Sequence, residues 1–357
     1  MTDNRSRMKR VFLLFIFSLC IVFAFSQEKD MPQKGEGIYA FLRRHNRTEA
    51  KQYEEFIQLN KHKLGKSNTL LHGISYILPP LTTNSDNKKK ESTTGSSDKK
   101  EYQNEKSKIG TGTQLLFGEN YKNYEIKDNK LSGACFFLVS GHGGPDSGAI
   151  AMVDNQELHE DEYAYDIMLR LARNLMEHNA TVYIIIQDSK DGIRDDKYLN
   201  NSKNETCMGK KIPLGQLARL NQRTNEINGL SIRSKEKYQR AIFIHLDSRS
   251  KKKQLDVFFY YQNVKQNKTQ SLKLAETMQK TFRSFYDKHQ PDRGFSGTVS
   301  TRPLYVLKNT MPVSLFVELA NMQNTSDQKR YLLSENRQAL ANWMCEGFIK
   351  DYQSASR

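Results

Sequence analysis

Short apolar segments alternate with longer amphipathic ones from about Gln114 to the end of the 357-residue chain. The short segments predict strands, and the longer ones, with apolar residues every three or four positions, predict helices. Such alternation is typical of a mostly parallel, twisted sheet with helices on both faces. We therefore expect an α/β domain over residues 113–357. Its expected strands are 134–139, 181–187, 241–246, 257–261, 304–307 and 314–319, and its expected helices are 161–178, 214–229, 271–289 and 335–351.

The N-terminal segment predicts export. Residues 11–25 are apolar apart from Ser18, and several basic residues precede them. This run is shorter than the roughly 20 residues of a membrane span, and the small residues Ala24 and Ser26 are typical of a signal-peptide cleavage site. We expect residues 1–26 to be a cleaved signal peptide, with an uncleaved anchor as the alternative. The mature protein is then expected in the periplasm, the cell wall or the extracellular space, without stable membrane insertion.

Two further regions precede the α/β domain. Residues 35–80 combine helically spaced apolar side chains with a short apolar segment that ends at two prolines, which predicts a small folded unit. Residues 81–112 have almost no large apolar side chains, so we expect a flexible polar linker. The net charge of +15 suits a polyanionic partner. Export and the lack of a recognisable nucleic-acid motif argue against nucleic acid as that partner.

Polar residues stand at or near the ends of the expected strands, where the sites of open α/β sheets gather. His142 follows the first strand in a glycine-rich loop, and His245 lies near the end of the third. Glu318 interrupts the last apolar strand, and Glu160 precedes the helix after the first strand. Each has a structural explanation, such as a favourable charge at a helix N-terminus for Glu160. Glu318 is the hardest to explain in this way, because an unpaired buried carboxylate is costly.

Taken together, these residues predict a metal site. Two histidines and one carboxylate are the donor set of a catalytic zinc ion with an open position, and a second carboxylate would serve as general base. Asp161 and Glu162 stand next to Glu160, so residue types alone leave three candidates for the acidic ligand.

Four segments then lead to a family. HGGPDSGA, LHEDEYAYDIMLRLARNL, IFIHLDS and VELAN follow one another in this order, and together they resemble zinc-dependent N-acetylmuramoyl-L-alanine amidases of the amidase_3 type. The resemblance covers about residues 134–349. It implies one zinc ion held by His142, Glu160 and His245, with Glu318 as the catalytic base. The implied reaction is hydrolysis of the amide between the lactyl group of N-acetylmuramic acid and L-alanine of the stem peptide.

The N-terminal unit resembles a LysM module through GEGIYAFLRRH, FIQLN and LLHGISYILP. This resemblance implies two strands and two helices that bind the glycan strand of peptidoglycan, while the catalytic domain binds the stem peptide. A protein activator is a further candidate partner. Two alternatives to the amidase remain: a non-catalytic peptidoglycan-binding or regulatory protein, and a zinc peptidase that cuts within the stem peptide.

Overall fold

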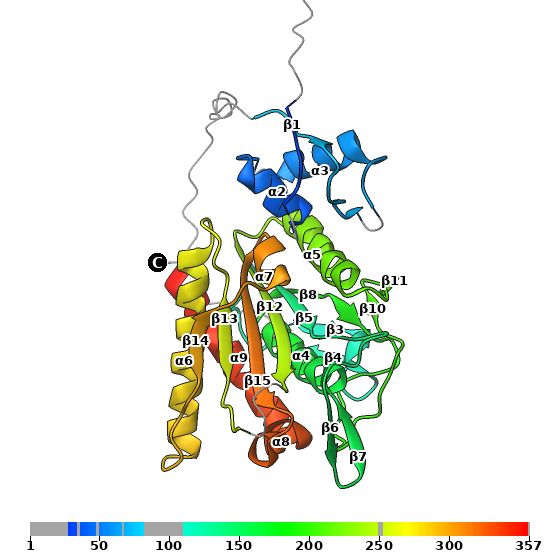
Figure 1. The fold of residues 1–357 in the computed structure, drawn as a ribbon. Coiled ribbons are helices and arrows are strands. Elements are labelled where there is room, and N and C mark those ends of the chain that lie inside the picture. Colours follow the sequence, from blue (N-terminus) through cyan, green and yellow to red (C-terminus); the bar gives the residue numbers. More distant parts are fainter. Residues whose placement is uncertain are drawn as a thin grey trace, which may run out of the picture.

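The computed structural model describes residues 28–33, 36–47, 50–65, 68–81, 110–248 and 253–355 (Figure 1). The predicted signal peptide and nearly all of the predicted linker lie outside these residues. The last linker positions belong to β3 (Thr111–Thr113), which pairs with β4 (Asn123–Glu125). Within the described ranges, we find no helix with the length and apolar content that crossing a membrane requires.

A six-stranded sheet forms the centre of the α/β domain, in the order β14-β13-β15-β12-β5-β8. Neighbouring strands run parallel, except that β13 is antiparallel to β15. The mostly parallel sheet predicted from the sequence is therefore confirmed. The strands are β5 (Ala134–Ser140), β8 (Thr181–Ile184), β12 (Tyr238–Asp247), β13 (Phe258–Tyr261), β14 (Thr298–Thr301) and β15 (Val313–Asn321).

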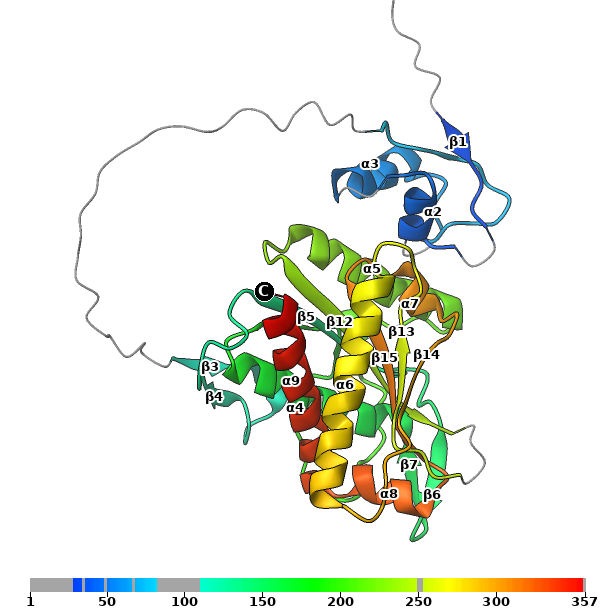
Figure 2. The ribbon, with the colours of Figure 1, turned by 90° about the vertical axis from the view of Figure 1, so that its left-hand side faces the viewer.

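Helices cover both faces of this sheet (Figures 1 and 2). Side chains alternate between the two faces along a strand. Phe136 and Leu138 of β5 accordingly join one apolar core, whereas Phe137 and Val139 join the other. The first core is covered by α4 (Glu160–Glu177), α6 (Lys268–His289), α8 (Thr325–Leu332) and α9 (Ser334–Ala355), and the second by α5 (Gln216–Arg233) and α7 (Tyr305–Asn309).

Several expected elements differ from the observed ones. The predicted strand 304–307 is wrong, because Leu304 is the N-cap of helix α7 and the next three residues begin the helix, which buries Val306 and Leu307. Strand β14 and helix α8 were not predicted. The expected strand 181–187 is divided into β8 and β9 (Ile186–Gln187). Strand β9 belongs to a separate small sheet in which β10 (Thr206–Cys207) pairs with both β9 and β11 (Lys210–Lys211).

The N-terminal unit has the expected two strands and two helices, namely β1 (Lys29–Asp30), α2 (Ile38–Arg44), α3 (Ala50–Asn60) and β2 (Tyr76–Ile77). The expected start at residue 35 is too late, since β1 pairs antiparallel with β2. Phe41, Phe56 and Tyr76 form its core, and the unit lies against α5 and α7 of the α/β domain (Figure 1).

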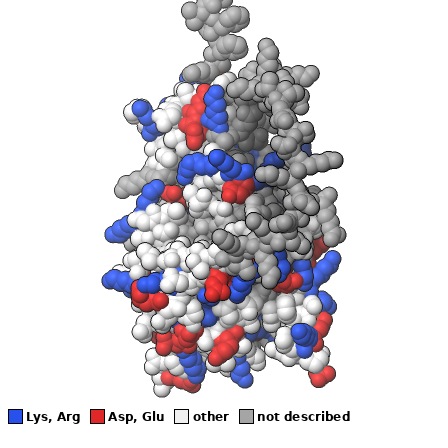
Figure 3. All heavy atoms as spheres, turned by 180° about the vertical axis from the view of Figure 1, so that it is seen from behind, with Lys and Arg blue, Asp and Glu red and all other residues white. Residues whose placement is uncertain are grey.

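The net charge of +15 is not gathered into one patch on the face that Figure 3 displays. Among the described residues on that face, Lys and Arg side chains are interspersed with Asp and Glu side chains. Nucleic-acid surfaces are instead marked by basic side chains clustered on one face or along a helix. The charge pattern of this face therefore gives no indication of a nucleic-acid surface.

Candidate metal centre

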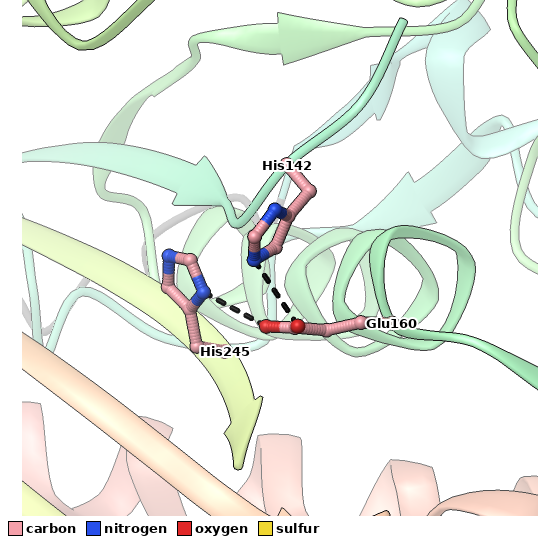
Figure 4. A group of neighbouring side chains, drawn as sticks. All are labelled: His142, Glu160 and His245. Atoms are coloured by element: carbon pink, nitrogen blue, oxygen red, sulfur yellow. Dashed lines mark hydrogen bonds and ion pairs between the residues drawn. The ribbon is translucent and has the colours of Figure 1, made fainter. Parts of the chain in front are cut away.

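Strands β5 and β12 and helix α4 bring three polar side chains together at the carboxyl edge of the sheet (Figure 4). His142 stands in the loop after β5, Glu160 is the first residue of α4, and His245 lies near the end of β12. One potential ligand atom from each residue lies within 4.8 Å of the other two. The arrangement therefore offers two nitrogen donors and one oxygen donor to a single ion.

The Glu160 carboxylate faces both imidazoles, with one oxygen directed at each ring (Figure 4). Its Oε2 is 3.1 Å from Nε2 of His142, and its Oε1 is 2.8 Å from Nδ1 of His245. The backbone amides of Ala149 and Leu246 also donate to this carboxylate, at 3.0 and 3.2 Å. Burial raises the pKa of Glu160, but the hydrogen bonds with both histidines outweigh it and hold the pKa well below its usual range. The group is thus ionised at neutral pH, as a metal ligand must be.

Asp146 and Arg219 fix the other side of the His142 ring. Oδ2 of Asp146 lies 3.0 Å from Nδ1 of His142, and Arg219 of α5 donates to the same oxygen at 2.7 Å. Burial lowers the pKa of His142, but its hydrogen bonds with Asp146 and Glu160 raise it to about 10. Because Nδ1 is engaged by Asp146, Nε2 is the nitrogen that faces the shared centre.

The His245 ring is held by packing as well as by hydrogen bonding. It stacks on Phe316 with a centroid separation of 4.4 Å, and burial lowers its pKa. The neutral imidazole that metals bind is therefore favoured at this position. The two histidine side chains keep 26% and 17% of their surface exposed, so the centre is open to solvent.

Two glycines leave the space that these side chains occupy. A Cβ on Gly141 would lie 2.4 Å from the His245 ring, and one on Gly148 would lie 2.7 Å from both His142 and the Glu160 carboxylate. Gly148 also has a φ of +71°, which L side chains rarely adopt. The glycine-rich loop thus forms a cradle around the donors, and the nitrogen and oxygen donor set fits zinc.

Glu318 lies next to this group on the neighbouring strand. In the parallel pairing of β12 with β15, Glu318 stands directly opposite His245. Phe316, two positions earlier on β15, stacks on His245, so Glu318 projects from the same face of the sheet. The Glu318 side chain is buried, with 4% of the residue exposed. All four residues singled out from the sequence therefore lie at one edge of the sheet.

The family model of N-acetylmuramoyl-L-alanine amidases, amidase_3, matches residues 137–350. The chain belongs to this family. The resemblance to the amidase_3 family that was stated from the sequence is therefore confirmed. Members of this family are hydrolases that act on peptidoglycan.

Solved structures similar to this amidase come from several bacteria. Cwp6 from Clostridium difficile is 20% identical with a TM-score of 0.44, and the match covers 61% of this chain and 29% of Cwp6. The amidase AmiC2 of Nostoc punctiforme is 18% identical with a TM-score of 0.44, and the match covers 62% of this chain and 99% of AmiC2. The CwlD amidase from Clostridioides difficile, solved in complex with the GerS lipoprotein, is 20% identical with a TM-score of 0.44. This match covers 62% of this chain and 99% of CwlD. No curated protein matches this chain.

The structure also distinguishes the three consecutive acidic residues that the sequence left as equal candidates for the acidic ligand. Glu160 lies with the two histidines, whereas Asp161 and Glu162 form another acidic group with Glu205. Sequence reasoning gave Asp146 no role, although its position four residues after His142 in the same loop was an available signal.

Proposed function

We propose that this amidase hydrolyses the amide between the lactyl group of N-acetylmuramic acid and L-alanine of the stem peptide, with zinc as its metal. The observation that carries the proposal is the convergence of His142, Glu160 and His245, whose donor atoms lie within 4.8 Å of one another. Family membership supports the choice of bond.

The three donors would hold one zinc ion and leave a position for water or substrate. Bound there, zinc would supply a water of lowered pKa and a polarised carbonyl group. Glu318 accepts the proton of the attacking water and then gives it to the departing nitrogen of L-alanine. Its position opposite His245 in the strand pairing supports this role.

Digestion of purified peptidoglycan, followed by mass analysis, tests this function directly. We expect intact stem peptides and peptide-free glycan, with loss of release after chelation and recovery on addition of zinc. Fragments of the stem peptide would instead indicate a peptidase. An absence of any release by the zinc-loaded protein would favour a binding or regulatory role.

Asp146→Asn is expected to weaken zinc binding by about 10- to 100-fold, the usual effect of losing a partner that orients a metal-bound histidine. The substitution keeps the shape of the side chain but removes the charge shared by His142 and Arg219. Competition with a chromophoric chelator measures the affinity.

The matched control for this experiment is Asp154→Asn, because Asp154 lies in the turn between β6 (Ile150–Val153) and β7 (Gln156–His159) and its side chain is 66% exposed. It is expected to bind zinc like the wild type. An unchanged affinity in Asp146→Asn would contradict the orienting role of Asp146.

We further propose that residues 28–81 form a LysM-like module that holds the exported enzyme on glycan strands in the periplasm or cell wall. Pro32, Gln33, Glu36 and segment 69–72 of this unit line a cavity of about 460 Å³ together with Leu217, Asn221 and Tyr305 of the α/β domain. A cavity of this volume, lined by both polar and apolar side chains, suits a small part of a glycan. Gly37 donates its amide to Asn309 at 2.8 Å, so the unit lies directly against the catalytic domain.

His72→Glu is expected to reduce peptidoglycan binding about five-fold or more, because it places a negative charge in the cavity lining. Co-sedimentation with insoluble peptidoglycan measures the binding, and cleavage of a soluble fragment should be unchanged. His62→Glu is the matched control, since His62 is exposed on the same unit but does not line the cavity. Equal binding by both variants would place the glycan elsewhere.

A further inference from the structure

A second group of acidic side chains lies next to the candidate metal centre. Asp161 and Glu162 follow Glu160 in the first turn of α4, and Glu205 immediately precedes β10. One oxygen of each residue lies within 4.8 Å of the others. All three residues are buried, with 2%, 1% and 6% of their surface exposed.

The hydrogen bonds of the surrounding protein satisfy this group only in part. Glu162 accepts from Arg194 at 2.9 Å and from the amide of Ser202, and Glu205 accepts from the amide of Gly144 at 2.8 Å. Oδ1 of Asp161 accepts from the amide of Glu162, but Oδ2 of Asp161 is buried without a hydrogen-bond partner among the described residues.

The charges are also unbalanced. Within the part of the chain that the structure describes, Arg194 is the cation paired with this group, and it is shared with Asp191. Arg223 and His142 act electrostatically on Glu205 and Asp161, but neither forms an ion pair with this group among the described residues. Three buried carboxylates with one shared arginine in direct contact are unfavourable without a further cation. The positive N-terminal end of α4 offsets their charge only in part.

We propose that Asp161, Glu162 and Glu205 bind a second divalent cation, of the class that takes oxygen ligands, such as Ca²⁺. The group contains carboxylates without histidine or cysteine, which favours Ca²⁺, Mg²⁺ or Mn²⁺ over zinc. Oxygen atoms within 4.8 Å of one another are compatible with one Ca²⁺ at about 2.3–2.6 Å from each. The orphaned oxygen of Asp161 then gains a partner.

The position of this site gives the ion a structural role. Glu205 holds the amide of Gly144, which belongs to the same loop as His142, whereas Asp161 and Glu162 adjoin Glu160. The ion therefore connects the segment before β10 with the two segments that supply His142 and Glu160. This inference concerns a separate donor set and does not depend on the reaction that the amidase catalyses.

Calcium titration of the full-length protein, freed of metal and then saturated with zinc, tests the proposal. We expect one Ca²⁺ per chain by calorimetry and elemental analysis, together with a rise in the melting temperature. Glu205→Gln and Asp161→Asn should lower the calcium affinity at least ten-fold while zinc remains bound. Glu157→Gln, whose side chain is 61% exposed on β7, is the matched control and should bind Ca²⁺ like the wild type.

His245→Ala separates this proposal from the zinc site. The variant should still bind Ca²⁺, because its lost side chain belongs to the other group. The proposal is overturned if Ca²⁺, Mg²⁺ and Mn²⁺ all fail to bind the wild type, since the carboxylates would then share protons instead. Calcium binding that survives in both Glu205→Gln and Asp161→Asn, or a second zinc ion in place of calcium, would also overturn it.

Discussion

Glu318→Gln is expected to lower kcat for stem-peptide release by about two to four orders of magnitude, the usual contribution of a general base. Glutamine has nearly the same volume and keeps a hydrogen-bonding oxygen, but it does not accept the proton of water. The zinc donors are left unchanged, so zinc content and melting temperature should remain close to those of the wild type. Peptide release from purified peptidoglycan gives the activity, and elemental analysis of the same sample gives the zinc content.

The matched control is Glu125→Gln, the same chemical change at an exposed position on β4. It should retain full activity. If Glu318→Gln stays within about threefold of the wild-type rate, Glu318 is not the base. If the variant instead loses zinc, Glu318 acts as a ligand, and the proposed division of roles between the two carboxylates is wrong.

The central sheet was predictable from the sequence because its strands are buried on both faces. A segment such as ACFFLVS is apolar up to its last residue, since alternate residues enter the two cores on opposite sides of β5. The short segment around Val306 and Leu307 was misread as a strand for a related reason. Two adjacent apolar residues fit one turn of helix as well as a strand, and only packing against the sheet decides between them.

The candidate site was predictable in its residue types but not in its geometry. Glu160, Asp161 and Glu162 are consecutive, and successive side chains of a helix point about 100° apart. Only the placement of β5 and β12 around the start of α4 determines which carboxylate faces the histidines. The contact of Arg219 with Asp146 joins α5 to the loop after β5, and no local pattern in the sequence reports such a pair.

The glycines of this loop show how the sequence is related to the geometry of the site. In the sequence, the glycines around His142 indicated only a glycine-rich loop after the first strand. Gly141 and Gly148 have a more specific requirement in the folded protein, because a Cβ at either position would collide with a donor side chain. The packing of the donor side chains therefore requires glycine at these two positions of the loop.

His245→Ala is expected to lower zinc affinity by about 100-fold or more and to abolish measurable release at trace zinc. A structural zinc site contributes about 10–16 kcal/mol, so the loss of one of the three protein ligands proposed here is expected to cost about 3 kcal/mol or more, which is about 100-fold or more in affinity. The Glu160 carboxylate keeps His142 and the amides of Ala149 and Leu246 as partners, so the variant should still fold.

The comparison of the two inactive variants distinguishes a ligand from a base. His245→Ala should regain part of its activity as zinc is raised, because Glu318 is still present to take the proton. Glu318→Gln should not, because its metal site is already full. Restoration of Glu318→Gln by excess zinc, or full zinc occupancy of His245→Ala at trace zinc, would contradict the roles assigned to these neighbouring residues on β12 and β15.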